Sequence, residues 1–149
     1  MYLGSAGFGW HMERGIHILR LLAAGVFDKY PKLKIVIGHM GELLPFQLER
    51  IAKFAGRGAF EERKWGLMDM WDNNIWVTTA GMFSLNSLAC LLRNTKAERM
   101  LNSVDYPLST NEEGLEFVEE MKQSGMVTKE GLERIAWRNA EELLGVKAR

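Results

Sequence analysis

Hydrophobic and polar positions along the chain predict a series of helices separated by three short apolar runs. The first helical pattern extends from about Trp10 to Tyr30, and its apolar residues leave little polar face. Such a helix should be covered on most of its sides, and Pro31 should end it because the residue before a proline disfavours the helical conformation. Capping residues and helical spacing predict further helices at residues 45–55, 85–93, 110–125, from 128 onwards and 139–144. Residues 56–74 are predicted to form a loop and a short helix.

The three apolar runs are predicted to be strands, at residues 33–38, 75–79 and 100–104. The first is apolar without alternation after Lys34, which is typical of a strand buried on both faces of a parallel sheet. Because strands alternate with helices, the pattern indicates βαβ units and a parallel α/β sheet. Three parallel strands are too few for a closed barrel or a self-contained doubly wound sheet, so part of the fold is expected to be missing.

Composition narrows the class of protein. Residues 1–149 have neither an internal repeat nor a linker and are interpreted as a single domain, with 19 basic and 19 acidic side chains. This balance gives no reason to expect nucleic-acid binding or an anionic membrane surface, and no apolar run is long enough to span a bilayer. Without a secretion-signal pattern, the expected location is the cytoplasm. The single cysteine, Cys90, excludes an internal disulfide and is expected to be a small buried apolar residue.

Two predicted strand ends carry groups capable of chemistry. His39 and Glu42 follow the first strand, and Asp105 follows the third. In parallel α/β folds reactive groups collect where strands end, and a carboxylate bonded to one histidine nitrogen fixes the tautomer of the ring. From these positions alone, however, a simple loop hydrogen bond and ordinary turn chemistry explain the residues equally well.

Other candidates are weaker. His11, Glu13 and His17 resemble a metal cluster, and Glu13 and His17 could share a helix face, but no third ligand has fitting spacing. His17 lies within the apolar stripe and is interpreted as a core histidine. Three tryptophans could stack on an aromatic substrate but more often serve packing: Trp65, Trp71 and Trp76.

Several sequence motifs, which together span nearly the whole chain, occur in a fixed order. Residues 9–46 contain Gly-Trp-His-Met-Glu-Arg-Gly at their start and Ile-Gly-His-Met-Gly-Glu-Leu-Leu-Pro-Phe at their end. Trp-Val-Thr-Thr-Ala-Gly-Met-Phe-Ser, Ser-Val-Asp-Tyr-Pro and Asn-Ala-Glu-Glu-Leu-Leu-Gly follow at residues 76–84, 103–107 and 139–145. Together they resemble the amidohydrolase superfamily, in the branch related to aminocarboxymuconate semialdehyde decarboxylase that includes γ-resorcylate and dihydroxybenzoate decarboxylases.

The resemblance implies the C-terminal portion of a (β/α)8 TIM barrel, incomplete on its own. His39 then corresponds to the family's active-site histidine, which acts in proton transfer, and Glu42 to the glutamate that orients it. Asp105 corresponds to a ligand of the catalytic divalent metal, zinc or manganese. The family also implies a small-molecule carboxylic acid as substrate and, often, an oligomeric enzyme.

Departures from the family leave alternatives open. The metal-binding motifs of the family's first and fifth strands are absent from this chain, and Asn102 stands where the family has a large apolar residue. The expected function is non-oxidative decarboxylation of an aromatic or related unsaturated acid. The alternatives are a metal-dependent hydrolase of the same superfamily, or an inactive half-barrel that needs another copy or the missing N-terminal half. Whether this chain alone is active therefore stays open.

Overall fold

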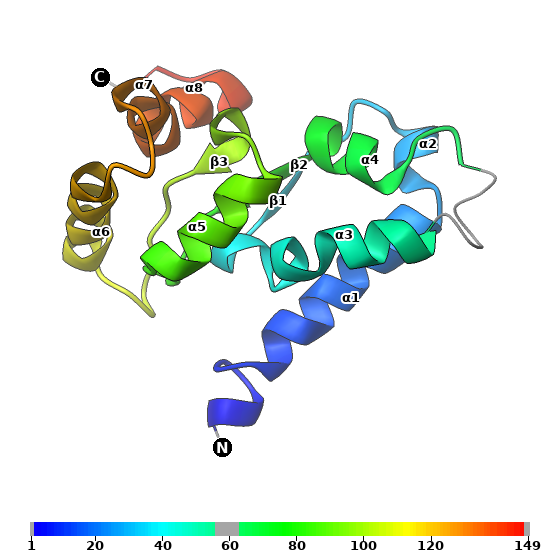
Figure 1. The fold of residues 1–149 in the computed structure, drawn as a ribbon, viewed down its shortest axis with the longest axis horizontal. Helices are drawn as coiled ribbons and strands as arrows, with labels where there is room; N and C mark the ends of the chain where they lie inside the picture. Colours follow the sequence, from blue (N-terminus) through cyan, green and yellow to red (C-terminus); the bar gives the residue numbers. More distant parts are fainter. Residues whose placement is uncertain (1, 56–62, 148–149) are drawn as a thin grey trace.

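The computed structural model describes residues 2–55 and 63–147. Three strands lie in the middle of the fold, and the N-terminal half of the first long helix projects away from them (Figure 1). The part of the predicted loop at residues 56–62 lies outside the described residues. The helical and strand segments are η1 Tyr2–Gly4, α1 Gly9–Ala23, α2 Val26–Lys29, β1 Ile35–Ile37, η2 His39–Gly41, α3 Leu44–Ala55, α4 Leu67–Asn74, β2 Ile75–Thr78, α5 Leu85–Asn94, η3 Ala97–Arg99, β3 Met100–Leu101, α6 Asn111–Ser124, α7 Lys129–Glu133, a π-helical turn Arg134–Arg138 and α8 Asn139–Leu144.

The sheet has the predicted parallel architecture. Its strand order is β1-β2-β3, with Ile35 opposite Ile75 and Val77 opposite Met100. The third strand is shorter than predicted because its continuation bonds elsewhere. The Asn102 amide donates to the Ile135 carbonyl, and the Ser103 amide donates to a threonine hydroxyl of the neighbouring segment. These bonds replace a strand ladder beyond Leu101, so the prediction of a strand to residue 104 is wrong at its end.

Helix α1 differs from the sequence prediction in length and orientation. It ends at Ala23, since Gly25 adopts a left-handed conformation with φ 72° and starts the short helix α2. Its buried side consists of Gly15, Ile18 and Leu22, whereas Ile16 is exposed. His17 is exposed, so its interpretation as a core histidine is wrong for the described structure.

Local capping signals are confirmed. The side chain of Ser84 accepts a hydrogen bond from the Ser87 amide at the start of α5, and that of Thr128 accepts one from the Gly131 amide at α7. Thr110 forms the predicted capping box with the glutamate three residues later, and a left-handed glycine ends α6 at residue 125. These caps satisfy backbone amides that the first turn of a helix leaves unpaired.

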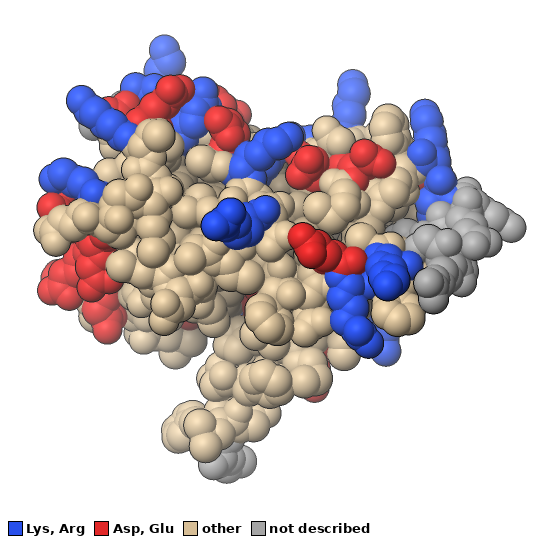
Figure 2. Space-filling model, viewed as in Figure 1, with Lys and Arg blue, Asp and Glu red and all other residues tan. Residues whose placement is uncertain are grey.

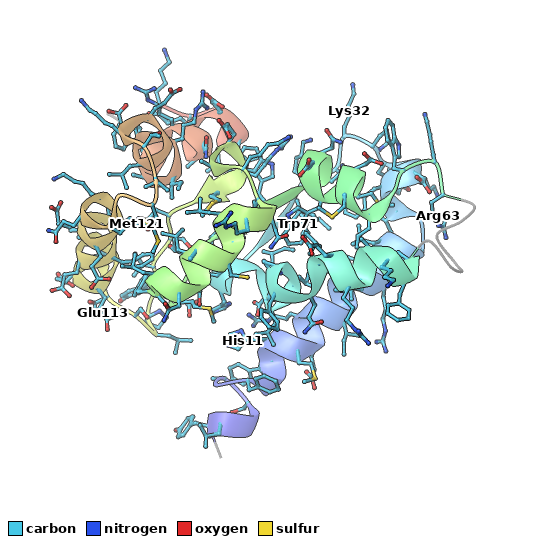
Figure 3. All side chains as sticks on the ribbon, viewed as in Figure 1. His11, Lys32, Arg63, Trp71, Glu113 and Met121 are labelled. Atoms are coloured by element: carbon cyan, nitrogen blue, oxygen red, sulfur yellow. The ribbon has the colours of Figure 1, made fainter. Side chains whose placement is uncertain are left out.

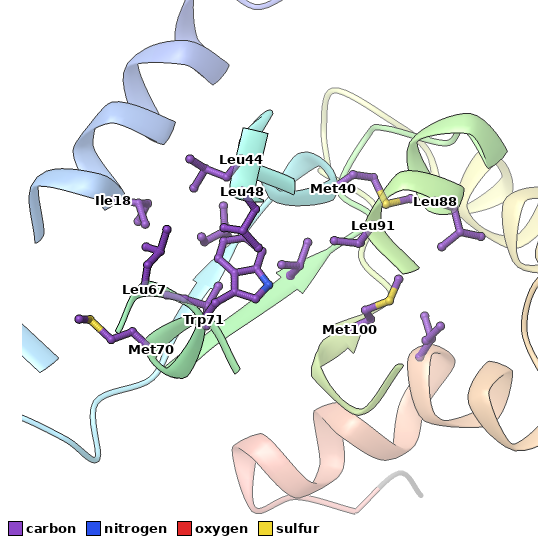
Figure 4. Packing of buried hydrophobic residues seen from close by; sticks show 14 of the residues in the cluster. Ile18, Met40, Leu44, Leu48, Leu67, Met70, Trp71, Leu88, Leu91 and Met100 are labelled. Carbon is purple, nitrogen blue, oxygen red and sulfur yellow. The ribbon is translucent and has the colours of Figure 1, made fainter. Parts of the chain in front are cut away.

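The hydrophobic core consists of buried side chains of the sheet, of helices α3, α4 and α5, and of α1, α2, α6 and the π-helical turn, and Figure 4 shows part of it. Trp71 is buried at its centre, and its indole nitrogen donates to Thr95 Oγ1 at 2.9 Å. Trp76 is also buried, which agrees with a packing role, whereas Trp65 is partly exposed. Cys90 is only half-buried, so the expectation of a buried thiol is too strong.

Charged side chains surround this core without forming a basic stripe on the face shown in Figure 2, where acidic side chains gather over α6. Among residues 2–55 and 63–147, every helix is too short or too polar to cross a lipid bilayer.

Candidate active site

The turn after β1 is conformationally strained. His39, Met40 and Glu42 all have positive φ values, of 46°, 54° and 55°. A residue with a side chain pays about 1–2 kcal/mol for the left-handed conformation, and such strain clusters at functional sites. Gly41 permits the sharpest part of the turn, because a Cβ atom there would lie 2.7 Å from Pro45 Cγ. The turn thereby directs the His39 and Glu42 side chains towards one another.

Glu42 is the centre of a polar cluster. Its side chain is only 2% exposed. His39 Nδ1 lies 2.9 Å from Oε1, His11 Nδ1 lies 2.6 Å from Oε2, and the Arg14 guanidinium is 3.4 Å from Oε1. Burying an ionised carboxylate is costly unless donors surround it. The three neighbours supply those donors.

His39 joins this cluster to the segment that follows β3. Its Nε2 atom lies 3.3 Å from Asp105 Oδ2, although the two residues are 66 positions apart in the sequence. Asp105 itself has a φ of 71°. The structure therefore brings together the three residues singled out from the sequence, His39, Glu42 and Asp105, because the carboxyl ends of parallel strands lie at one edge of the sheet and β1 and β3 flank the same strand, β2.

His11 is the member of the cluster that the sequence analysis did not place with Glu42, since it was considered only beside Glu13 and His17. It lies on the N-terminal half of α1 (Figure 3) with a side chain only 12% exposed. Its ring contacts that of His39 edge-on, at 4.7 Å between centroids, while Glu13 and His17 are exposed and take no part. Helical spacing could have indicated that His11 faces the interior, because it shares one helix face with the buried residues Gly15, Ile18 and Leu22.

A cavity of about 310 Å³ opens beside these groups. Its wall includes the side chains of His11, Arg14, His39 and Asp105, together with Trp10. The volume is at the lower end of the range for small-molecule sites, about 300–1,000 Å³. Histidine and arginine side chains on its wall are suited to an anionic ligand.

The donor types also fit part of a metal site. Asp105 offers an oxygen and His39 a nitrogen, which zinc and manganese both accept. His11, His39 and Glu42 also place possible ligand atoms within 4.8 Å of one another. Both Glu42 oxygens, however, already accept hydrogen bonds from the histidines, so an ion there would have to displace them. Asp105 is therefore the better-placed ligand, and a complete site needs donors beyond these residues.

Gly81 permits close approach of the loop after β2 to Asp105. Its φ is 65°, and a Cβ atom there would lie 3.0 Å from Asp105 Oδ2. We expect Gly81→Ala to lower the free energy of unfolding by about 2 kcal/mol or more, from left-handed strain plus this contact. Gly125→Ala is the matched control because its φ is 67° with nothing within 4 Å of the added carbon. Urea unfolding measures both variants, and equal losses would contradict a special role for the Asp105 contact.

Comparison with known proteins places this geometry in context. A model of the family described as Amidohydrolase matches residues 1–146. "Decarboxylase orsB" of Emericella nidulans is 53% identical over 145 residues, which cover 97% of this chain and 44% of that protein. The γ-resorcylate decarboxylase of a Polaromonas species is 33% identical over 137 residues, covering 88% of this chain and 40% of that protein.

Solved structures agree with the fold. The dihydroxybenzoic acid decarboxylase of Polaromonas sp. JS666, solved with bound manganese and the inhibitor 2-nitroresorcinol, superposes with a TM-score of 0.81. It is 31% identical, and the match covers 97% of this chain and 45% of that chain. This chain thus spans less than half the length of the proteins it matches, with three parallel strands and flanking helices that correspond to part of a barrel.

Proposed function

Because this chain belongs to the amidohydrolase family, we propose that it forms part of a metal-dependent decarboxylase acting on an aromatic carboxylic acid. The observation that carries the proposal is His39, held between Glu42 and Asp105 at the ends of parallel strands. The decarboxylase names of two relatives support the reaction type. A structural relative that binds 2-nitroresorcinol supports an aromatic substrate.

In the proposed reaction, His39 supplies the proton that replaces the carboxylate. The bond between the ring carbon and the carboxylate breaks, carbon dioxide leaves, and a new carbon–hydrogen bond forms with the proton from Nε2. Glu42 accepts from Nδ1 throughout and so keeps that nitrogen protonated, which makes Nε2 the nitrogen that gives up its proton. Atoms and charge balance, because one carboxylate and one proton become carbon dioxide and a C–H bond.

Asp105 is proposed as one ligand of the divalent metal. When bound, such an ion supplies positive charge that orients an anionic substrate and stabilises developing negative charge. Manganese is bound in the Polaromonas structure, which supports a divalent ion at this position. Arg14, whose side chain is 56% exposed and lines the same cavity, is placed to attract the substrate carboxylate.

The open side of the fold supports a requirement for further barrel strands. Within the described residues β1 pairs only with β2, and Val36 on β1 is 48% exposed. Apolar side chains on and beside α1, including Phe8 and Met12, are also exposed. An unpaired strand edge next to apolar surface favours association. We propose that the remaining barrel strands cover this side, in place of a second copy of the same chain.

A chimera tests the proposed function. The chain replaces the aligned segment of the Emericella nidulans relative, so that the rest of that protein is present to supply what this chain lacks. We expect carbon dioxide release from 2,6-dihydroxybenzoate or a related hydroxybenzoate, and near-stoichiometric metal by elemental analysis. Asp105→Ala is expected to abolish both, because it removes one ligand from a site that needs several. Ester or lactone cleavage without carbon dioxide release would instead support the hydrolase alternative.

A further inference from the structure

We propose that His11 is a positioning residue that holds Glu42 so that one carboxylate oxygen stays available to His39. The effect of this positioning on catalysis rests on the proposed function, whereas the positioning itself does not. The two histidines divide the carboxylate between them, since His11 Nδ1 bonds Oε2 at 2.6 Å and His39 Nδ1 bonds Oε1 at 2.9 Å. Neither oxygen serves both rings.

The Glu42 carboxylate needs such a restraint. Its terminal torsion joins tetrahedral and planar atoms, and rotation there has only broad, weak preferences. Donors must therefore decide which oxygen faces His39. Because the side chain is only 2% exposed, water is a poor substitute for a lost donor. Within residues 2–55 and 63–147, His11 is the one side chain that contacts Oε2, and removing it would leave a buried acceptor without this partner.

His11 is itself held in place from its other side. Its Nε2 atom lies 2.8 Å from the Ala6 carbonyl oxygen, which can only accept a hydrogen bond. The Glu42 carboxylate at Nδ1 is likewise an acceptor, so both contacts are made together when the ring carries a proton on each nitrogen. The orientation of the His11 ring is therefore fixed by a contact at each nitrogen, with Glu42 at Nδ1 and with the Ala6 carbonyl at Nε2.

The backbone of α1 approaches the site closely enough for this contact. A Cβ atom at Gly15 would lie only 3.0 Å from the Glu42 carbonyl oxygen. The absence of a side chain at Gly15 therefore allows α1 to pack closely against the turn that carries Glu42. His11 is one helical turn before Gly15 on the same face. The contact between the helix and the turn therefore sets the distance between the His11 ring and the carboxylate.

Arg14 competes with His39 for the Glu42 carboxylate, so loss of His11 is expected to disturb the bond between Glu42 and His39. Arg14 approaches Oε1, the same oxygen that His39 uses, at 3.4 Å. Without His11, both remaining donors act on Oε1, and rotation of the carboxylate towards Arg14 would weaken the bond to His39. His11 thus preserves the orientation of His39 by occupying the opposite oxygen.

Two variants of His11 separate this role from packing. Asparagine places an amide nitrogen near the position of Nδ1, so His11→Asn retains a donor to Glu42 and loses the bond to Ala6. Glutamine places its amide nitrogen near the position of Nε2, so His11→Gln retains the bond to Ala6 and loses the donor to Glu42. The exposed His17 on the same helix provides the control His17→Gln.

Imidazole ¹⁵N and proton NMR of the chain is the measurement, because only three histidines are present. We expect the His39 Nδ1 proton signal, protected by Glu42, to persist in His11→Asn and His17→Gln. In His11→Gln it should exchange with solvent at least about tenfold faster, the effect of losing about 1.4 kcal/mol of protection. Circular dichroism verifies that each variant is folded.

An unchanged His39 signal in folded His11→Gln would overturn the proposal, as would equal loss of the signal in both His11 variants. Kinetics of the chimera add a second readout, in which His11→Gln should lower kcat with little change in KM while His11→Asn retains most activity. If the NMR result is as expected but the chimera releases no carbon dioxide, His11 still positions His39 and the proposed function fails instead.

Discussion

Replacing His39 with asparagine in the chimera is expected to lower kcat for carbon dioxide release by about 100- to 10,000-fold, the contribution typical of general acid catalysis. The substitution is chosen for its geometry. The asparagine amide nitrogen lies near the position of Nδ1 and can still donate to Glu42, so the buried carboxylate keeps a partner. What is lost is Nε2, the atom 3.3 Å from Asp105 that is proposed to deliver the proton.

The control for this prediction is His17→Asn, since His17 is exposed and apart from the cluster. Initial rates over a range of substrate concentrations separate kcat from KM. A KM that changes little in His39→Asn would indicate that substrate still binds while proton delivery fails. A kcat within tenfold of the unsubstituted chimera would argue against His39 as the proton donor.

The second large effect is expected on stability, from Asn139→Asp. Asn139 is fully buried, and its side-chain nitrogen donates to the carbonyl oxygens of Ala97 and Met100, both at 2.7 Å. Aspartate would direct an oxygen at two carbonyl oxygens and introduce a buried charge without a donor. We expect the free energy of unfolding to fall by about 3–5 kcal/mol, the cost of an uncompensated buried charge. This is a large share of the roughly 5–15 kcal/mol that stabilises a typical domain.

Asn73→Asp is the matched control for Asn139→Asp. Asn73 also donates through its side-chain nitrogen to a backbone carbonyl, that of Asp69 at 2.7 Å, but the contact is exposed. Its loss should cost about 1 kcal/mol or less because water replaces the bond. Urea unfolding followed by tryptophan fluorescence compares the two. Similar midpoints for both variants would show that the buried contacts of Asn139 matter little.

The candidate site was partly predictable. Parallel strands bring their carboxyl ends to one edge, so the proximity of His39 and Asp105 followed from two strands and their order. Glu42 followed from its short separation from His39. Their catalytic and metal-binding roles stay predictions. The contact of His11 with Glu42 was not predicted because it depends on which face of α1 meets the turn after β1, and the apolar residues around that helix are compatible with more than one orientation.

Local signals in the sequence determined the order and type of the elements. The caps at Ser84, Thr110 and Thr128 act within one helical turn, and the apolar runs of the strands reflect burial that any parallel sheet requires. The family motifs likewise indicated part of a barrel, and the three parallel strands, together with a solved decarboxylase of which this chain matches 45%, agree with it.

Only the tertiary structure decided which residues far apart in the sequence share a contact. It ended β3 at Leu101, turned His17 outward and brought His11 against Glu42 across 31 positions. The physical reason is that a helical or strand period specifies faces, whereas the partner of each face depends on how the elements pack. A buried carboxylate satisfied by two histidines is a property of that packing.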